Sequence, residues 1–250
     1  MSTTMRLARG LTSEGRPVRS LTSAVLARLR AEILSSRLKP GEKMLIAGLA
    51  ECLGVSLSAV REALARLAAE GLVQGEDQRG FRVSPVSVED LRDITRTRVD
   101  LESMALRRAL ELGDARWEAG IRDAHARLAA TPLPRPGEAG PRFERWRARH
   151  QEFHLALVAG CQSRWLLRFR HILFEQSERY RFLAYGVRPR DIAGEHRRIM
   201  RLTLARDVKA AVSALGRHLT LTSDIIIESL GSRPSVVDGR IAPPGRASRR

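Results

Sequence analysis

Apolar residues recur at helical intervals in the first part of the chain, and one break interrupts their rhythm. Between Leu49 and Leu67 the apolar side chains fall three or four positions apart, as they do on one face of a helix. The rhythm breaks at Gly54 and the two residues after it. Gly54 can adopt the left-handed backbone that ends a helix, and Ser56 offers its hydroxyl as the N-cap of the next. The pattern predicts two short helices joined by a tight turn, the second running to about Glu70.

This helix pair has two interpretations, a DNA-binding helix-turn-helix or an ordinary αα-hairpin. The flanking segments favour the first. Residues 72–74 and 80–83 are short extended stretches around a polar tip, which is typical of a β-hairpin. An amphipathic helix over about 25–34 precedes the pair. A hairpin that directly follows a recognition helix makes a winged helix, whose second helix lies in the DNA major groove.

From residue 86 to residue 230 the pattern is almost wholly helical. The breaks are rich in Gly, Pro and Asp, which are typical of turns. We expect helices near Val88–Leu112, Ala115–Ala129, Pro141–Ala159, Ser163–Ala184, Pro189–Ala205 and Val208–Leu230.

The same pattern divides the chain into domains. Residues 1–17 and 231–250 are polar and basic without periodicity, so we expect a disordered arm and a disordered basic tail. Between them we expect a winged helix-turn-helix over 18–85 and an all-helical domain over 86–230. The predicted fold class is mainly α.

Composition and charge add limits to this picture. The 250 residues are 43% hydrophobic, which suits globular domains, and no apolar run approaches the ~20 residues that span a bilayer. We find no signal-peptide pattern and expect a cytoplasmic protein without a membrane partner. Cys52 and Cys161 are far apart, as expected for free thiols in a reducing compartment. The net charge of +16 suits a polyanionic partner, although most of the excess lies outside the predicted winged helix.

The winged-helix segment resembles the GntR family of bacterial transcription regulators. The resemblance is carried by LRAEILSSRLKPGEKM, LGVSLSAVREALARLAAEGLV and QRGFRV, which appear in order over roughly residues 21–85. It implies that double-stranded operator DNA is a partner and that Arg61 contacts it. The helix phase independently exposes Ser58 and Arg61, and an arginine can bind guanine bidentately. A solvated surface arginine is the alternative.

Other positions of the winged helix qualify this expectation. Ser56 lies at the positive end of the recognition helix, which suits a phosphate oxygen. Many GntR proteins carry Arg where this chain has Leu57 and Ala47; Leu57 can still contact a thymine methyl, whereas Ala47 donates nothing. Arg79 and Gly80 match the family's wing contacts, and a plain hairpin tip is the alternative there.

The helical segment resembles the FCD group, in which a helical bundle binds an effector. The matching features are Arg98-x-x-x-Glu102, Phe153-His154, Glu195-His196-Arg197 and Arg217-His218-Leu219. The run over 146–181 is similar to the carbon-starvation-induced regulators. The resemblance implies an effector pocket, and the expectation of a homodimer comes from two winged helices that would grip the half-sites of a palindrome. Arg98 matches a pocket residue and can clamp a carboxylate; its alternative is an ion pair with Glu102. Tyr180 is a further pocket candidate.

Four histidines fall where the FCD group places its metal ligands. His150 and His154 are four residues apart on one helix face, and His196 and His218 belong to two later helices. The group has Asp at the first of these positions, and its replacement by His150 removes a negative charge. Four imidazoles suit a divalent transition metal such as Zn²⁺ or Ni²⁺, and a small anionic effector, a carboxylate, is expected beside it. The alternative is a pocket that works without metal.

An enzyme is not expected. The run 150–154 superficially resembles the HExxH box of zinc peptidases, but Glu152 lies two positions after His150, roughly 200° around the helix. The sequence therefore predicts a dimeric, ligand-responsive repressor that binds a palindromic operator. A directly metal-responsive regulator, or a metal- or metabolite-binding sensor with a secondary DNA role, is the alternative. The effector and the operator sequence stay open.

Overall fold

The computed structural model describes residues 21–76, 80–135, 140–184 and 190–231. The predicted arm over 1–17 and all but the first residue of the predicted tail lie outside these ranges. The described residues form two compact units, and the boundary along the chain falls between Ser87 and Val88. The fold class is mainly α, as predicted.

The first unit is a winged helix. Its elements are α1 (Leu21–Leu34), β1 (Lys43–Met44), α2 (Ile46–Leu53), α3 (Leu57–Ala69), β2 (Val73–Glu76) and β3 (Gly80–Val83). The strands form an antiparallel sheet in the order β1-β3-β2. A continuous apolar core joins the three helices to the sheet; among its fully buried members are Leu29, Val60 and Leu64.

The tight turn between α2 and α3 follows from two residues. Gly54 has φ +66°, a left-handed conformation that costs glycine little, and it ends α2. The Ser56 hydroxyl accepts a hydrogen bond from the Ala59 N–H at 3.2 Å and so caps α3. Strand β1 was not predicted, because a two-residue strand is defined by its pairing with β3 rather than by a periodic pattern of its own.

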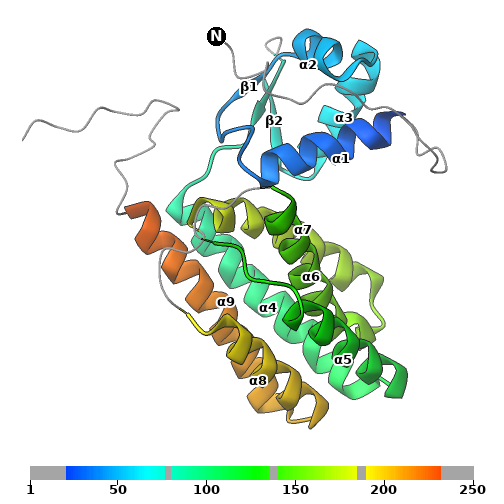
Figure 1. Cartoon of the computed structure of the whole chain (residues 1–250), viewed down its shortest axis with the longest axis vertical. Coiled ribbons are helices and arrows are strands. Elements are labelled where there is room, and N and C mark those ends of the chain that lie inside the picture. The colour runs from blue at the N-terminus through cyan, green and yellow to red at the C-terminus, as the bar shows by residue number, and fades with distance from the viewer. Residues whose placement is uncertain (1–20, 77–79, 136–139, 185–189, 232–250) are drawn as a thin grey trace, which may run out of the picture. The chain divides into compact units, whose positions relative to one another are not determined.

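The second unit is a bundle of helices (Figure 1). They are α4 (Val88–Leu112), α5 (Ala115–Ala129), α6 (Pro141–Val158), a short 3-10 turn (Ala159–Cys161), α7 (Arg164–Ala184), α8 (Ile192–Leu204) and α9 (Val208–Gly231). Helix α4 packs against α7 and α9, α5 packs against α6 and α8, and α8 packs against α9. One apolar core includes Leu106, Ile121, Phe153 and Leu215. This arrangement brings α6, α8 and α9, which carry the four candidate histidines, to the same interior.

Two further features bear on the expectations from the sequence. Cys52 is half-buried and Cys161 is buried, and neither of these two cysteines is in a disulfide bond. In the part of the chain that the structure describes, no helix has the length and apolar character needed to cross a membrane.

Candidate functional site

The N-terminal half of α3 presents the candidate DNA contacts. Ser56, Leu57, Ser58 and Arg61 are all exposed, and 52% of Leu57 is accessible although it is apolar. Arg61 makes no hydrogen bond or ion pair with any described residue. Five residues later Arg66 is paired with Glu62 at 2.5 Å. Arg61 is therefore an unpaired cation beside two hydroxyls at a helix N-terminus, as a DNA-facing residue would be.

The wing carries the remaining DNA candidates. Gly80 begins β3 with φ +96°, where a side chain would be strained, and it pairs with Glu76 across the hairpin. Arg82 stiffens the same hairpin, because it bonds Glu76 at 2.7 Å and donates to the Gly41 carbonyl. Arg79 lies outside the described residues.

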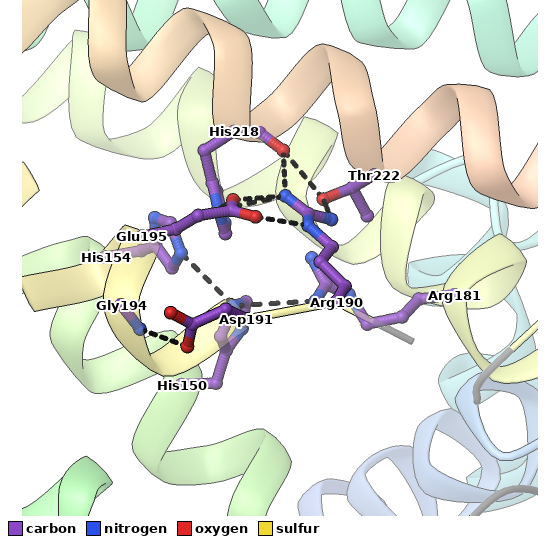
Figure 2. Close-up of polar contacts among 9 residues, drawn as sticks. All are labelled: His150, His154, Arg181, Arg190, Asp191, Gly194, Glu195, His218 and Thr222. Atoms are coloured by element: carbon purple, nitrogen blue, oxygen red, sulfur yellow. Dashed lines mark hydrogen bonds and ion pairs between the residues drawn. The ribbon is translucent and has the colours of Figure 1, made fainter. Parts of the chain in front are cut away.

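The four candidate histidines meet in the interior of the helical unit. His150 and His154 come from α6, His196 from α8 and His218 from α9, and each is at most 3% exposed. One nitrogen of each lies within 4.8 Å of the others, and the Nε2 atoms of His150 and His154 are 3.1 Å apart. Figure 2 shows the approach of His150, His154 and His218, together with the polar groups that surround them.

The electrostatics of this cluster keep its imidazoles neutral. Burial lowers the pKa of His150 well below its usual value, and the charge of Arg181 lowers it further. Burial and the neighbouring imidazoles likewise lower the pKa values of His154 and His196. The pKa of His218 falls to about 4, chiefly through burial, although Glu195 opposes the shift. Neutral imidazole is the form that binds a metal.

Glu195 and Arg190 orient the ring of His218 through its Nδ1 side. The Nδ1–H of His218 donates to Glu195 at 2.8 Å, which fixes the tautomer and leaves its buried Nε2 without a partner among the described residues. Arg190 holds Glu195 through two hydrogen bonds, at 2.6 and 2.5 Å, and also contacts Thr222 and the His218 carbonyl (Figure 2). Burial alone would raise the pKa of Glu195, but the hydrogen bonds from His218 and Arg190 bring it down to about 2.

These residues fit a divalent transition metal. Zn–N bonds of about 2.0–2.1 Å place tetrahedral nitrogens about 3.3 Å apart. The 3.1 Å separation of His150 and His154 is close to that value, and small inward shifts bring in the other two from their 4.8 Å spread. The unpartnered Nε2 of His218 and its carboxylate support are what a ligating histidine requires.

A network of buried arginines lies beside the histidines. Arg98 bonds Glu102 at 3.1 Å and Ser177 at 2.7 Å, and Arg170 approaches the second oxygen of Glu102 at 3.2 Å. Arg181 pairs with Glu178 at 2.7 Å. Three guanidinium groups therefore face two carboxylates, and a positive charge remains.

Of the three predicted effector residues, Arg98 lines a very small cavity, whereas Glu102 and Tyr180 do not. The Arg98 cavity, of about 20 Å³, is lined by Arg98, Arg181, Thr95, Ser177, Thr222 and Ser223 among others. The Nη2 atom of Arg98 is buried without a partner among the described residues. Arg181 also approaches His150 at 3.5 Å, so the cavity adjoins the histidine cluster. Glu102 orients two arginines instead of facing the cavity, and Tyr180 donates to Asp90 at 2.5 Å.

Sequence reasoning missed the supporting groups of this site. Arg170, Arg181 and Arg190 were not singled out, and Glu195 was named only within a stretch that matches the FCD group, without a role in the site. One signal was present: residues 170, 174, 177 and 181 recur at helical spacing, so that two arginines share the inner face of α7 with Phe174. Arginines on the buried face of a helix indicate charged partners.

Comparison with known proteins yields two family matches. Residues 21–83 match the bacterial regulatory proteins of the gntR family, and residues 93–221 match the FCD domain. Both matches fall on the units described above.

Individual relatives agree with these matches. The chain is 39% identical over 211 residues to the uncharacterized HTH-type transcriptional regulator BphR of Paraburkholderia xenovorans, covering 84% of this chain and 86% of BphR. It is 33% identical over 208 residues to the HTH-type transcriptional repressor GlaR of Escherichia coli, covering 81% of this chain and 94% of GlaR. The solved structure of E. coli McbR/YncC shares the fold, with a TM-score of 0.68 at 24% identity over 84% of this chain and 99% of that one.

Proposed function

This chain belongs to the GntR family of bacterial regulatory proteins and carries an FCD domain, and we propose the following mechanism for it as a DNA-binding transcriptional regulator. It acts as a repressor that binds a palindromic operator as a homodimer. A small anionic metabolite, a carboxylate, controls it from the helical unit. The observation that carries the proposal is the convergence of four buried neutral imidazoles beside buried arginines, in a chain whose other unit is a winged helix. The relative GlaR is named a repressor, which supports that direction of control.

The recognition helix supplies the operator contacts. Arg61 binds a guanine edge in the major groove, Ser56 and Ser58 bind phosphate oxygens, and Leu57 contacts a thymine methyl. Gly80 lets the wing approach the DNA backbone, and Arg79 is proposed from the sequence alone. Two copies read half-sites about one helical turn apart. Because a bacterial regulator of this kind binds chromosomal DNA, its proposed location is the cytoplasm.

An exposed aromatic face supports the homodimer. Trp165 and Phe169 lie one turn apart on α7, 51 and 50% exposed, with their rings stacked at 6.0 Å. Met104 is 51% exposed on α4, the helix that packs beside α7. Exposed apolar patches of this kind mark interaction sites. A second copy covers this face through a two-fold axis, which buries the same residues on both chains.

The histidines hold the metal and the arginines hold the effector. His150, His154, His196 and His218 are the proposed ligands of Zn²⁺ or Ni²⁺, which supplies a positive centre for an anion when bound. Arg98 and Arg181 receive the effector carboxylate. The Arg98 cavity of about 20 Å³ has room for about one water molecule. Effector binding therefore requires the cavity to enlarge. The effector binds the bundle with the enlarged cavity more tightly than the closed one, and so shifts the population towards the enlarged form.

Metal analysis of the purified protein tests this proposal, with His150→Asp as the companion variant. About one Zn²⁺ or Ni²⁺ per chain supports the four-histidine site. If only the His150→Asp protein binds metal, the native pocket works without metal and Arg98 is the effector's anchor. The alternative function, a directly metal-responsive regulator, is tested by titrating the metal alone against operator binding. Nothing in the arrangement of these groups favours catalysis.

A further inference from the structure

A second and larger pocket has His196 in its lining. It has a volume of about 380 Å³ and is formed by α5, the residues after it, α6 and the start of α8. We call it the α5–α8 pocket. Pockets of about 300–1,000 Å³ are typical of small-molecule sites, and a cavity of about 150 Å³ already holds benzene. The α5–α8 pocket is therefore large enough for a small molecule, in contrast to the Arg98 cavity of about 20 Å³.

Its lining separates into an apolar part and a cationic part. Leu128 and Trp146 are buried at its floor, and Leu133 stands 48% exposed at its edge. Arg197 is exposed on α8 and makes no hydrogen bond or ion pair with any residue in the described ranges. The other arginine of the lining, Arg190, is already engaged by Glu195. Arg197 is thus the cation available to a ligand.

Two more lining residues, His125 and Asp191, limit the net charge that the pocket favours in a ligand. Burial and the charge of Arg197 lower the pKa of His125, so at neutral pH it is an uncharged hydrogen-bond donor. Asp191 is the one carboxylate among the described lining residues, and it caps α8 by accepting from the Gly194 N–H at 2.8 Å. One available cation and one carboxylate favour a monoanion over a dianion.

The pocket is connected to the histidine cluster by aromatic contacts. The ring of His125 meets the edge of Phe153 with centroids 5.5 Å apart, and Phe153 lies 5.2 Å from the ring of His196. His196 itself lines the pocket, and its buried Nε2 has no partner among the described residues. A molecule in the pocket would therefore touch a proposed metal ligand from outside the cluster.

We propose that the α5–α8 pocket is a second ligand site, for a monoanion with a compact apolar body. The anionic group binds Arg197 and His125, and the apolar body packs against Leu128, Leu133 and Trp146. The site is separate from the Arg98 cavity. Its link to the proposed metal centre, through His196, rests on the proposed function; the pocket itself does not.

Calorimetric titration with benzoate tests this site on the full-length protein, with acetate and benzyl alcohol as probes that lack the ring or the charge. Benzoate is expected to bind with a dissociation constant of about 1 mM or below, and more tightly than either control. Arg197→Gln should weaken it roughly tenfold, because a charged hydrogen bond is lost. Arg198→Gln is the matched control, since Arg198 is an exposed neighbour on α8 that does not line the pocket. It should leave binding unchanged.

Filling the pocket gives an independent check. Ala193 lines it and is exposed near the start of α8, so Ala193→Trp should block benzoate while the protein stays folded. The proposal is overturned if benzoate does not bind the folded native protein, if the two arginine variants bind alike, or if binding survives Ala193→Trp. Zinc content, measured on the same proteins, decides the metal proposal separately, because a native protein that binds benzoate but no zinc would contradict only the metal site.

Discussion

The carboxylate of Glu195 accepts the Nδ1–H of His218 at 2.8 Å and is itself held by two hydrogen bonds from Arg190. This relationship fixes which nitrogen of His218 faces the cluster. Supporting carboxylates of this kind typically contribute 10–100-fold in metal affinity. We expect Glu195→Ala to weaken zinc binding by about that factor, measured by competition with a chromophoric chelator. Glu195→Gln keeps an acceptor and should lose less; equal affinities in all three proteins would contradict the role of Glu195.

Arg61→Ala should weaken operator binding by about 1–3 kcal/mol, because it removes the unpaired arginine that we propose as the contact to a guanine edge. The measurement is fluorescence anisotropy with a selected operator and a scrambled duplex. Arg66→Ala is the matched control, since Arg66 lies on the same helix but is paired with Glu62. If the two variants lost the same operator affinity, Arg61 would contribute only non-specific electrostatic attraction to DNA and would not contact a particular base.

His196→Ala should abolish the response to metal or effector and leave metal-free operator binding intact. His196 is 3% exposed in the cluster, whereas His171 is exposed on α7 and contacts only Glu175 among the groups described. His171→Ala therefore serves as the control. Operator affinity is measured with and without zinc for each protein. A His196→Ala variant that still responds like the native protein would remove His196 from the site.

Acid should destabilise the metal-free protein in a defined pH range. The pKa values of His150, His154 and His196 lie well below 6.5 in the folded chain, and that of His218 lies at about 4. Below pH ~6.5 the unfolded state therefore binds more protons than the folded state, and stability falls as the pH falls. Each imidazole contributes up to about 1.4 kcal/mol per pH unit. Urea midpoints at pH 7 and pH 5.5 measure this; equal midpoints would contradict neutral buried imidazoles.

Replacing both Trp165 and Phe169 by Glu should give a monomer. Both residues are about half exposed and neither belongs to the apolar core of the helical unit, so we expect the double variant to fold. Light scattering coupled to size exclusion measures the mass, which for one chain is 27.9 kDa. The control is Leu155→Glu, a change at a 42% exposed residue on α6. A dimer that persists in the double variant, or is lost equally in the control, would place the interface elsewhere.

Much of the fold could be predicted from the sequence because its helices are amphipathic and because residues typical of turns and caps, such as Gly, Pro and Asp, mark the helix ends. The boundary between α4 and α5 was predicted as observed, since Asp114 follows a glycine and caps α5 by accepting from the Trp117 N–H at 2.8 Å. Helix α8 begins at Ile192 and not at Pro189, because the side chain of Asp191 takes the capping position.

The candidate site could be predicted only in part. His150 and His154 share a helix face by spacing, but the meeting of that face with His196 and His218 depends on how three helices pack. The sequence suggested it through family resemblance alone. The ion pair of Arg170 with Glu102 joins residues 68 positions apart, and the lining of the α5–α8 pocket comes from three separate segments. Helical periodicity carries no information about such distances.

The small volume of the Arg98 cavity, about 20 Å³, has a consequence for the operator as well as for the effector. If the bundle must expand to admit a carboxylate, any partner that prefers the unexpanded bundle competes with that carboxylate without touching it. Coupling of this kind is reciprocal. Bound operator DNA would then act as an allosteric inhibitor of effector binding. Chains on their operators would need a higher metabolite concentration to respond than chains free of DNA, and the unbound pool would take up the metabolite first.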